Sequence, residues 1–583
     1  MKVYGRMTCL AFSLCLFSCV AASAQERFQD RLPENTLAYV ASSGRPALDG
    51  VRGTNPLLRL LASPEMQANW EALRARQSRS KHPNAKAGIS PEEEEFFELL
   101  KASGLVALLP PGDVAPACAT GPPQPIFLFL LDAAGQEERI AGLRARAQST
   151  GSAYVSYEFE GVTVEEARDR AGATTGYLAR LDRWLVGGSD KTATENWIRA
   201  VRQAPESSLK NTEAYTSARG LLRGSGQAEV YVNFPALVDL FAAVPSLGQA
   251  APPPEQIVSA LGLRAFGPLL ASAEFRADTT RYEIVLARRE SAANPLDALA
   301  PAAPQFASLP LGGSDAISYS VTHVDLQAGW SYLNGAAAAL VPPAALFVQM
   351  ADSFLQEQTG LTLPQVIGVW GDELAHFEYS AKGAMPLDTV WALRHRDRAR
   401  VQALVEGALP TVGQRFGVQA VEALGGKEGI PAYYRLVFKP TESSTQGEPA
   451  EAPASFFLAV TDEWLLFAPS ESALQRTLAR EAGAPSLADS DNYRRARSRF
   501  PAELSTFGFM DAEAWIASGA VQSFLDQAVA AQQAKQASEA QESGTPPDPP
   551  PPLKLAIPRG YLKWIVTGTT QDARGVYHSG YIE

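Results

Sequence analysis

The stretch LDRWLV at residues 181–186 has a counterpart in TDEWLL at residues 461–466. Each is followed by a Ser-led stretch with helical spacing and then by a second matched segment, SLKNTEAY at 208–215 and SLADSDNY at 486–493. In both copies Leu and Tyr of this second segment are six positions apart. Similar segments in the same order, with similar spacing, predict an internal structural repeat.

The similarity between the two copies continues into an expected strand and the beginning of the helix that follows it. Residues 231–237 read YVNFPAL and residues 509–515 read FMDAEAW, which places Asn233 opposite Asp511. A short side-chain oxygen at this place suits a helix N-cap, because it accepts free backbone N–H groups of the following turn. The helices before these strands are expected to bury apolar residues at i, i+3 and i+7, which are Tyr215, Ala218 and Leu222 in the first copy and Tyr493, Ala496 and Phe500 in the second.

These patterns predict an α+β protein of two similar repeats, each an antiparallel or mixed β-sheet covered by helices on one face. Each repeat closes with a β-hairpin, at 270–287 and at 562–582. The expected divisions are a signal peptide at 1–24, a first repeat at 25–290, an Ala/Pro-rich linker at 291–308 and a second repeat at 309–583, the last with a helical and Pro-rich insert at about 520–552.

Composition narrows the class of protein. The chain has 583 residues, a formal charge of −12, 46% apolar and 20% charged residues, as in soluble globular proteins of several domains. The acidic balance, without basic blocks, predicts no nucleic-acid partner. No segment approaches the ~20 apolar residues of a transmembrane helix, so none is expected.

The amino terminus predicts export. Lys2 and Arg6 precede an apolar stretch that ends in the small-residue site Ala22-Ser23-Ala24, so the mature chain is expected to begin at Gln25. The alternative is a lipobox at 16–19, in which Cys19 would carry a lipid anchor. The protein is expected in the periplasm or cell envelope, or alternatively as an outer-membrane lipoprotein.

After cleavage at Ala24 a single cysteine, Cys118, remains. No intramolecular disulfide is then possible, and burial has to stabilise the chain. Cys118 lies in a Pro/Gly-rich stretch without a nearby histidine, which favours a loop residue over a catalytic thiol.

Several phrases resemble a known family. LPENTLAYV at 32–40 and NPLLRLLASPE at 55–65 look like the opening of exported bacterial proteins of the domain-of-unknown-function 3352 family, and WGDEL at 370–374, DEWLL at 462–466 and SLADS at 486–490 are similar to phrases of the same group. These phrases are structural turns and caps. The resemblance implies neither an activity nor site residues.

The metal hypothesis concerns Glu373 and His376, whose spacing would place both on one face of a helix. Residues 372–379 alternate like a strand, however, and there a separation of three sends the two side chains to opposite faces. His376 and Glu378 would then share a face. We predict a histidine that is exposed or hydrogen-bonded rather than a metal ligand.

Catalytic patterns are equally weak. His323 and Asp325 are two residues apart on an expected strand end, where Asp325 better suits a helix cap. Ser78 with Lys81 and Ser207 with Lys210 match a serine–lysine spacing without its companion motifs. The remaining histidines are His82, His395 and His578. The prediction is therefore no catalytic, cofactor-binding or metal-binding residue, and no cofactor.

Trp184 and Trp464 are the strongest repeated feature. Aromatic side chains can line carbohydrate or peptide grooves, but large apolar rings at strand starts favour core packing. The sequence thus indicates a non-enzymatic binding or structural module, with an unknown envelope protein or ligand as partner. Two alternatives remain open, an envelope hydrolase with a cleft between the repeats and a lipid-anchored assembly factor.

Overall fold

The computed structural model describes most of the chain, with gaps. The described residues are 28–42, 50–69, 71, 104–111, 125–149, 151–224, 226–244, 252–289, 294–298, 306–341, 343–381, 387–415, 417–424, 432–438, 455–480, 484–520, 522–523 and 558–583. The predicted signal peptide with Cys19, and also His82, Ser78, Lys81, Cys118 and the proline run at 546–552, lie outside them.

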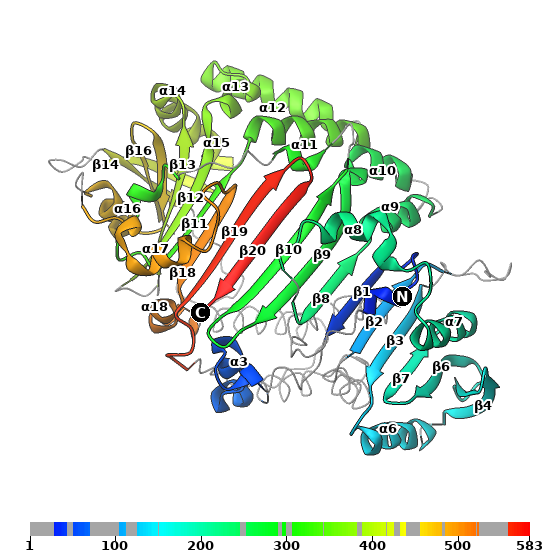
Figure 1. Cartoon of the computed structure of the whole chain (residues 1–583). Coiled ribbons are helices and arrows are strands. Elements are labelled where there is room, and N and C mark those ends of the chain that lie inside the picture. Colours follow the sequence, from blue (N-terminus) through cyan, green and yellow to red (C-terminus); the bar gives the residue numbers. More distant parts are fainter. Residues whose placement is uncertain are drawn as a thin grey trace, which may run out of the picture.

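In the described part of the chain the strands form one antiparallel sheet, of twenty strands (Figure 1). Its hydrogen-bonded order is β4-β5-β6-β7-β3-β2-β1-β8-β9-β10-β20-β19-β18-β11-β12-β13-β17-β16-β15-β14. Together with the helices, this confirms the α+β class. The strand bounds are β1 Ala38–Ser42, β2 Gly104–Leu109, β3 Ile126–Asp132, β4 Ala153–Phe159, β5 Val162–Arg168, β6 Thr174–Leu181, β7 Trp184–Gly188, β8 Ala228–Val232, β9 Phe266–Phe275, β10 Thr280–Arg288, β11 Ser318–His323, β12 Trp370–Ser380, β13 Leu387–His395, β14 Val418–Leu424, β15 Tyr433–Phe438, β16 Ser455–Val460, β17 Trp464–Ala468, β18 Thr506–Asp511, β19 Trp564–Asp572 and β20 Gly575–Ile582.

Both predicted closing hairpins form, as β9–β10 and β19–β20. The sequence predicted a separate sheet for each repeat, and here the structure differs: β10 pairs with β20 from Thr280↔Ile582 to Ala287↔Gly575. The physical reason lies in the strand edges. A closing strand left at an edge exposes a row of unpaired N–H and C=O groups, and in this chain each closing strand covers the edge of the other.

The pairing order is the same on both sides of this junction. Moving outward from β10 the strands follow as 9, 8, 1, 2, 3, 7, 6, 5 and 4, and outward from β20 as 19, 18, 11, 12, 13, 17, 16, 15 and 14. Registers also correspond, since Tyr39 opposes Tyr231 in β1–β8 and Tyr319 opposes Phe509 in β11–β18.

One face of the sheet is covered by short helices over two main clusters of buried residues. These helices are α7 Lys191–Arg202 and α8 Glu213–Arg219 on the first cluster, and α16 Glu471–Leu478 and α17 Asp491–Arg497 on the second. The predicted helix faces are confirmed, because Tyr215 and Ala218 are buried in α8, as are Tyr493 and Ala496 in α17. Burial of these apolar faces is the main stabilising term for such short helices.

The sequence predicts helices on one face of the sheet, and here the structure differs because helices cover both faces. In β16, Phe457 and Ala459 pack in the cluster that includes α16, whereas Leu458 and Val460 pack with Val401 of α14, Arg398–Ala403. Successive strand side chains point to opposite faces, so both faces of β16 are covered. Its uninterrupted apolar sequence, SFFLAV, is typical of a strand buried on two sides.

Further helices form a row along one rim of the sheet (Figure 1). They are α9 Phe234–Ala242, α10 Pro254–Ala260, α11 Leu326–Leu340, α12 Ala344–Thr359 and α13 Leu363–Gly368. The predicted N-caps are confirmed: Asn233 accepts from Ala236 N, Asp511 from Ala514 N, and Asp325 from Gln327 N and Ala328 N. Gly360 ends α12 with φ 70°, a conformation that a Cβ disfavours.

The two repeated tryptophans begin equivalent strands but differ in burial. Trp464 starts β17 and is 6% exposed within the second cluster. Trp184 starts β7, is half-buried at the margin of the first cluster, and has the guanidinium of Arg183 over its ring at 5.2 Å. The core prediction is therefore confirmed in full for Trp464 and only in part for Trp184.

This difference predicts unequal costs of truncation. Trp464→Ala should lower the free energy of unfolding by ~3–5 kcal/mol, because it empties a buried site. Trp184→Ala should cost clearly less, since that ring keeps contact with water. Urea denaturation of both variants measures this difference, and an equal or larger loss for Trp184→Ala would contradict it.

Candidate functional site

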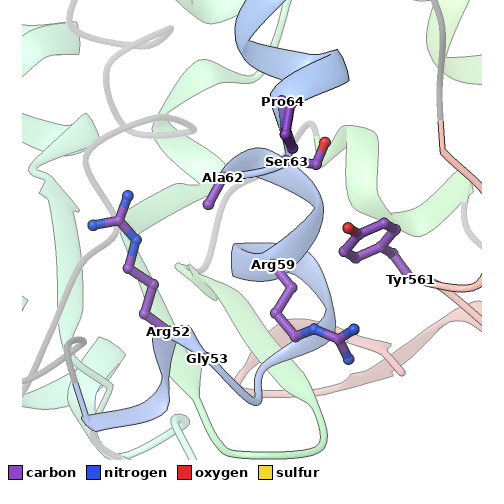
Figure 2. Close-up of a pocket in the computed structure, with 7 residues that line it drawn as sticks. All are labelled: Arg52, Gly53, Arg59, Ala62, Ser63, Pro64 and Tyr561. Carbon is purple, nitrogen blue, oxygen red and sulfur yellow. The ribbon is translucent and has the colours of Figure 1, made fainter.

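The hollow that offers a candidate binding site lies where the first half of the chain meets the second. It has a volume of about 470 Å³ and is lined by Arg52, Gly53, Arg59, Ala62, Ser63, Pro64 and Tyr561 (Figure 2). All but Tyr561 belong to α3, Pro56–Leu61, and its flanks. Tyr561 comes from the segment that leads into β19.

Side-chain hydrogen bonds fix α3 in place. Asn55 caps the helix by accepting from Leu58 N, and its Nδ2 donates to the carbonyls of Arg276 at 2.6 Å and Thr279 at 3.0 Å. Asn55 is fully buried, so these bonds satisfy a group that would otherwise be costly to bury. The cap therefore attaches the hollow to the β9–β10 turn.

Apolar contacts attach α3 to the other half. Leu60 packs in a small cluster with Leu562 and Ala512, close to Met66 and Ile582. Arg59 lies over the ring of Tyr561, with its Cζ 5.1 Å from the ring centroid, as in cation–π contacts. The hollow is thus a junction between elements far apart in the sequence.

The chemistry of the hollow is limited. Figure 2 shows the guanidinium groups of Arg52 and Arg59 pointing in different directions, so they do not converge on one point. The Ser63 hydroxyl accepts a hydrogen bond from Met66 N at 3.3 Å and acts as a helix cap. The lining residues include no carboxylate or imidazole. They supply cationic and aromatic contacts but no acid–base pair.

Carboxylates do occur inside the protein, and each is held by donors. Glu229 is 8% exposed and accepts from the hydroxyls of Tyr39 and Tyr215. Burial, and then Glu229, raise the pKa of both phenols, so they remain protonated donors. The three groups join β1, β8 and α8.

Two further carboxylates have the same role. Glu373 is 1% exposed and accepts from the backbone N–H groups of Ala307 at 2.9 Å and Ser308 at 2.7 Å. Glu283 accepts from Tyr577 across the β10–β20 junction and from Arg281. Burial and then Glu283 raise the pKa of Tyr577 to about 12. These carboxylates hold elements together.

The Glu373–His376 pair separates as the strand reading predicts. Glu373 points into the core from β12, while His376 lies on the opposite face, where its Nε2 is 3.9 Å from Glu378 Oε1. Burial lowers the pKa of His376, and Glu378 opposes that shift. Within the described ranges there is no group of three His, Cys, Asp or Glu side chains that could hold a metal ion.

The two other candidate pairs within the described residues are not brought together. Asp325 caps α11, and His323 is buried with its ring stacked on Phe306 at 5.6 Å. The Ser207 hydroxyl donates to Glu34 at 2.5 Å, whereas Lys210 pairs with Asp30 at 3.1 Å. Neither a His–Asp dyad nor a Ser–Lys dyad forms at these positions.

No pattern in the sequence predicts the hollow. Arg59 lies in the segment 55–65, which has the features of a capped helix, and Tyr561 lies about five hundred positions later. Capping chemistry at Asn55 and Pro56 locates α3, but no local signal pairs it with Tyr561. That contact depends on the β10–β20 junction.

Comparisons with known proteins add little. No family model matches the chain, and no curated protein matches it. Crystal forms I, III and IV of TP0453 are similar to part of it, with 9%, 10% and 11% identity and TM-scores of 0.23, 0.23 and 0.22. The matches cover 48%, 46% and 44% of this chain and 90%, 81% and 79% of those chains. TM-scores this low do not indicate a shared fold.

The half-buried His578 gives this protein a predicted pH dependence. Burial lowers the pKa of His578, whose Nδ1 lies 2.9 Å from Thr569 Oγ1. Its folded pKa is below the value of about 6.5 expected when unfolded, so below that pH the unfolded chain binds a proton that the folded chain does not. His578 therefore lowers the free energy of unfolding progressively as the pH drops from about 6.5 towards the folded pKa, and it has no such effect above that range.

The melting temperature from pH 8 to pH 5 tests this sign. His578→Gln should flatten the decline below about pH 6.5 and leave the curve above pH 7.5 parallel to that of the unaltered chain. An unchanged slope in the variant would show that His578 does not contribute.

Proposed function

We propose that this chain is an exported, non-enzymatic binding or structural module of the cell envelope, related to the domain-of-unknown-function 3352 family and built from a doubled α+β unit. The observation that carries the proposal is the use of the interior ionisable groups. Glu229, Glu283 and Glu373 each receive hydrogen bonds that join neighbouring elements. An enzyme instead directs such groups into a cleft.

The doubled unit is supported by the common strand order on the two sides of β10–β20 and by matched registers. It would place the first unit at 25–290 and the second at 309–583, joined by the 291–308 linker. When a scaffold is duplicated, both copies have to keep the apolar packing that stabilises the fold. Polar residues that form a site in one copy can be lost from the other without loss of the fold. Glu229 illustrates this, because Phe507 takes its place opposite β11 in the second half.

The hydrolase hypothesis has one observation in its favour, the hollow between α3 and Tyr561. Its two arginines and its phenol suit an anionic or aromatic ligand rather than bond cleavage. We therefore rank hydrolysis below binding. The hypothesis of a lipid-anchored assembly factor requires that Cys19 carries the lipid anchor.

Mass spectrometry of the mature protein tests export and the anchor together. We expect periplasmic material whose first residue is Gln25. An acylated Cys19 as the first residue would favour the outer-membrane lipoprotein, and a cytoplasmic chain that retains Met1 would contradict export.

Matched cap variants test the doubled unit. Asn233→Ala and Asp511→Ala remove the same cap from α9 and α18, Ala512–Ala517, and each should lower the free energy of unfolding by ~1 kcal/mol. Denaturant titration of the two single variants provides the comparison. A clear cost at only one position would argue against equivalent helices.

A further inference from the structure

Large apolar side chains are exposed mainly along the helical rim. Twelve such residues are exposed among those described, and eight of them belong to α9, α11 and α12 or to the turns that follow α9 and α11. These helices pack in sequence, α9 on α10, α10 on α11 and α11 on α12, and Figure 1 shows them in one row. We call these eight residues the apolar rim: Leu237, Leu240, Val244, Leu333, Val341, Leu346, Phe347 and Met350.

The most exposed part of the apolar rim is on α12. Leu346 is 62% exposed, Phe347 69% and Met350 67%. Their spacing of i, i+1 and i+4 places them on one side of the helix. Val348 and Leu355 are half-buried, and none of the described side chains of α12 is fully buried. The first half of α12 therefore turns Leu346, Phe347 and Met350 towards solvent, whereas Phe354 in its second half is half-buried.

This surface is also uncharged over a long stretch. Residues 326–351 contain no Asp, Glu, Lys or Arg, although charged residues make up 20% of the chain. The helices α9 to α13 together contain four acidic residues and no basic one, namely Asp239, Glu255, Asp352 and Glu357. Exposed Leu, Phe and Met without interspersed charge are unusual on a protein surface that faces only water.

Charge and geometry together define what fits this surface. Arg264, in the 3-10 turn that follows α10, is paired with Asp239 of α9 and Glu255 of α10. Helices α9 to α13 themselves contain no basic residue, so on a chain with a net charge of −12 this surface is not attracted to an anionic surface. The exposed apolar residues are distributed over α9, α11 and α12 rather than confined to one helix, which suits contact with an extended apolar phase. No helix among the described residues is long and apolar enough to cross a membrane.

We propose that the apolar rim rests on a lipid bilayer whose headgroups carry no net charge. Helices α11 and α12 lie in the plane of the interface, and Leu346, Phe347 and Met350 enter the boundary between headgroups and acyl chains, as amphipathic interfacial helices do. The driving force is apolar burial without electrostatic attraction. This surface is separate from the hollow and does not depend on a ligand there.

Vesicle flotation with the mature chain 25–583, produced without residues 1–24, tests the proposal, because no acyl group on Cys19 can then contribute. We expect the chain to float with phosphatidylcholine vesicles, and neither added phosphatidylglycerol nor lower salt should strengthen binding. Phe347→Asp should weaken partitioning by roughly tenfold or more, since it replaces a large apolar side chain with a charge.

Val155→Asp is the matched control. Val155 is 44% exposed on the edge strand β4, away from the apolar rim, and the substitution adds the same charge. It should float like the unaltered chain. Met350→Ala provides a milder second variant that adds no charge, and it should weaken flotation by a few-fold while keeping the unaltered melting temperature.

Three results would overturn the proposal. The unaltered chain could fail to float, the Phe347→Asp and Val155→Asp variants could float equally well, or binding could require phosphatidylglycerol. The alternative is that a second copy of this chain covers the apolar rim, and sedimentation velocity tests it by measuring the oligomeric state. A dimer that Phe347→Asp dissociates, with no flotation of the unaltered chain, would assign the apolar rim to self-association.

Discussion

The pairing of β10 with β20 is the constraint on which the remaining structure depends. Eight residue pairs, from Thr280↔Ile582 to Ala287↔Gly575, join the last strand of one half to the last strand of the other. Without that pairing both strands would be open edges, and open edges are prone to unwanted association. Because both strands close a hairpin, the junction converts two ten-strand arrays into one sheet.

Polar chemistry reinforces this junction. Glu283 and Ser579 face each other in the register, and both are 3% exposed. Glu283 accepts a hydrogen bond from the hydroxyl of Tyr577 on the opposite strand. It also accepts hydrogen bonds from the backbone N–H groups of Arg223 and Gly224, each at 3.2 Å. A buried carboxylate is costly to bury unless such donors surround it. The same arrangement also fixes the loop after α8 against the sheet.

The two halves use one packing scheme with different polar content. Tyr39, Tyr231 and Tyr215 pack together in the first half with Glu229 as the acceptor of two hydroxyls. In the second half Tyr319, Tyr493 and Phe509 occupy the corresponding strands and helix, beside Phe507. Burial of aromatic surface is common to both cores. Phe507 in the second half stands where Glu229 stands in the first, so the two cores share their aromatic packing but differ in polar content.

Local sequence determined the elements of this protein. Asn233, Asp511 and Asp325 were predictable as caps, Gly360 as a helix end, and the alternation at 372–379 as a strand, because each depends on interactions within a few residues. The closing hairpins and the buried helix faces were predictable for the same reason. The tryptophan pair located equivalent strands, although it did not reveal that Trp184 would be less buried than Trp464.

Tertiary structure decided which elements meet. The β10–β20 pairing, the contact of Arg59 with Tyr561 and the row of helices that forms the apolar rim join residues far apart in the chain. The alternation within one segment shows which side chains share a face, but it does not identify the strand that will pair with that segment, because the pairing hydrogen bonds join two separate segments. The sequence therefore specified the pieces and their faces, whereas the long-range pairing of two edge strands determined the single sheet and the surfaces at its junction and rim.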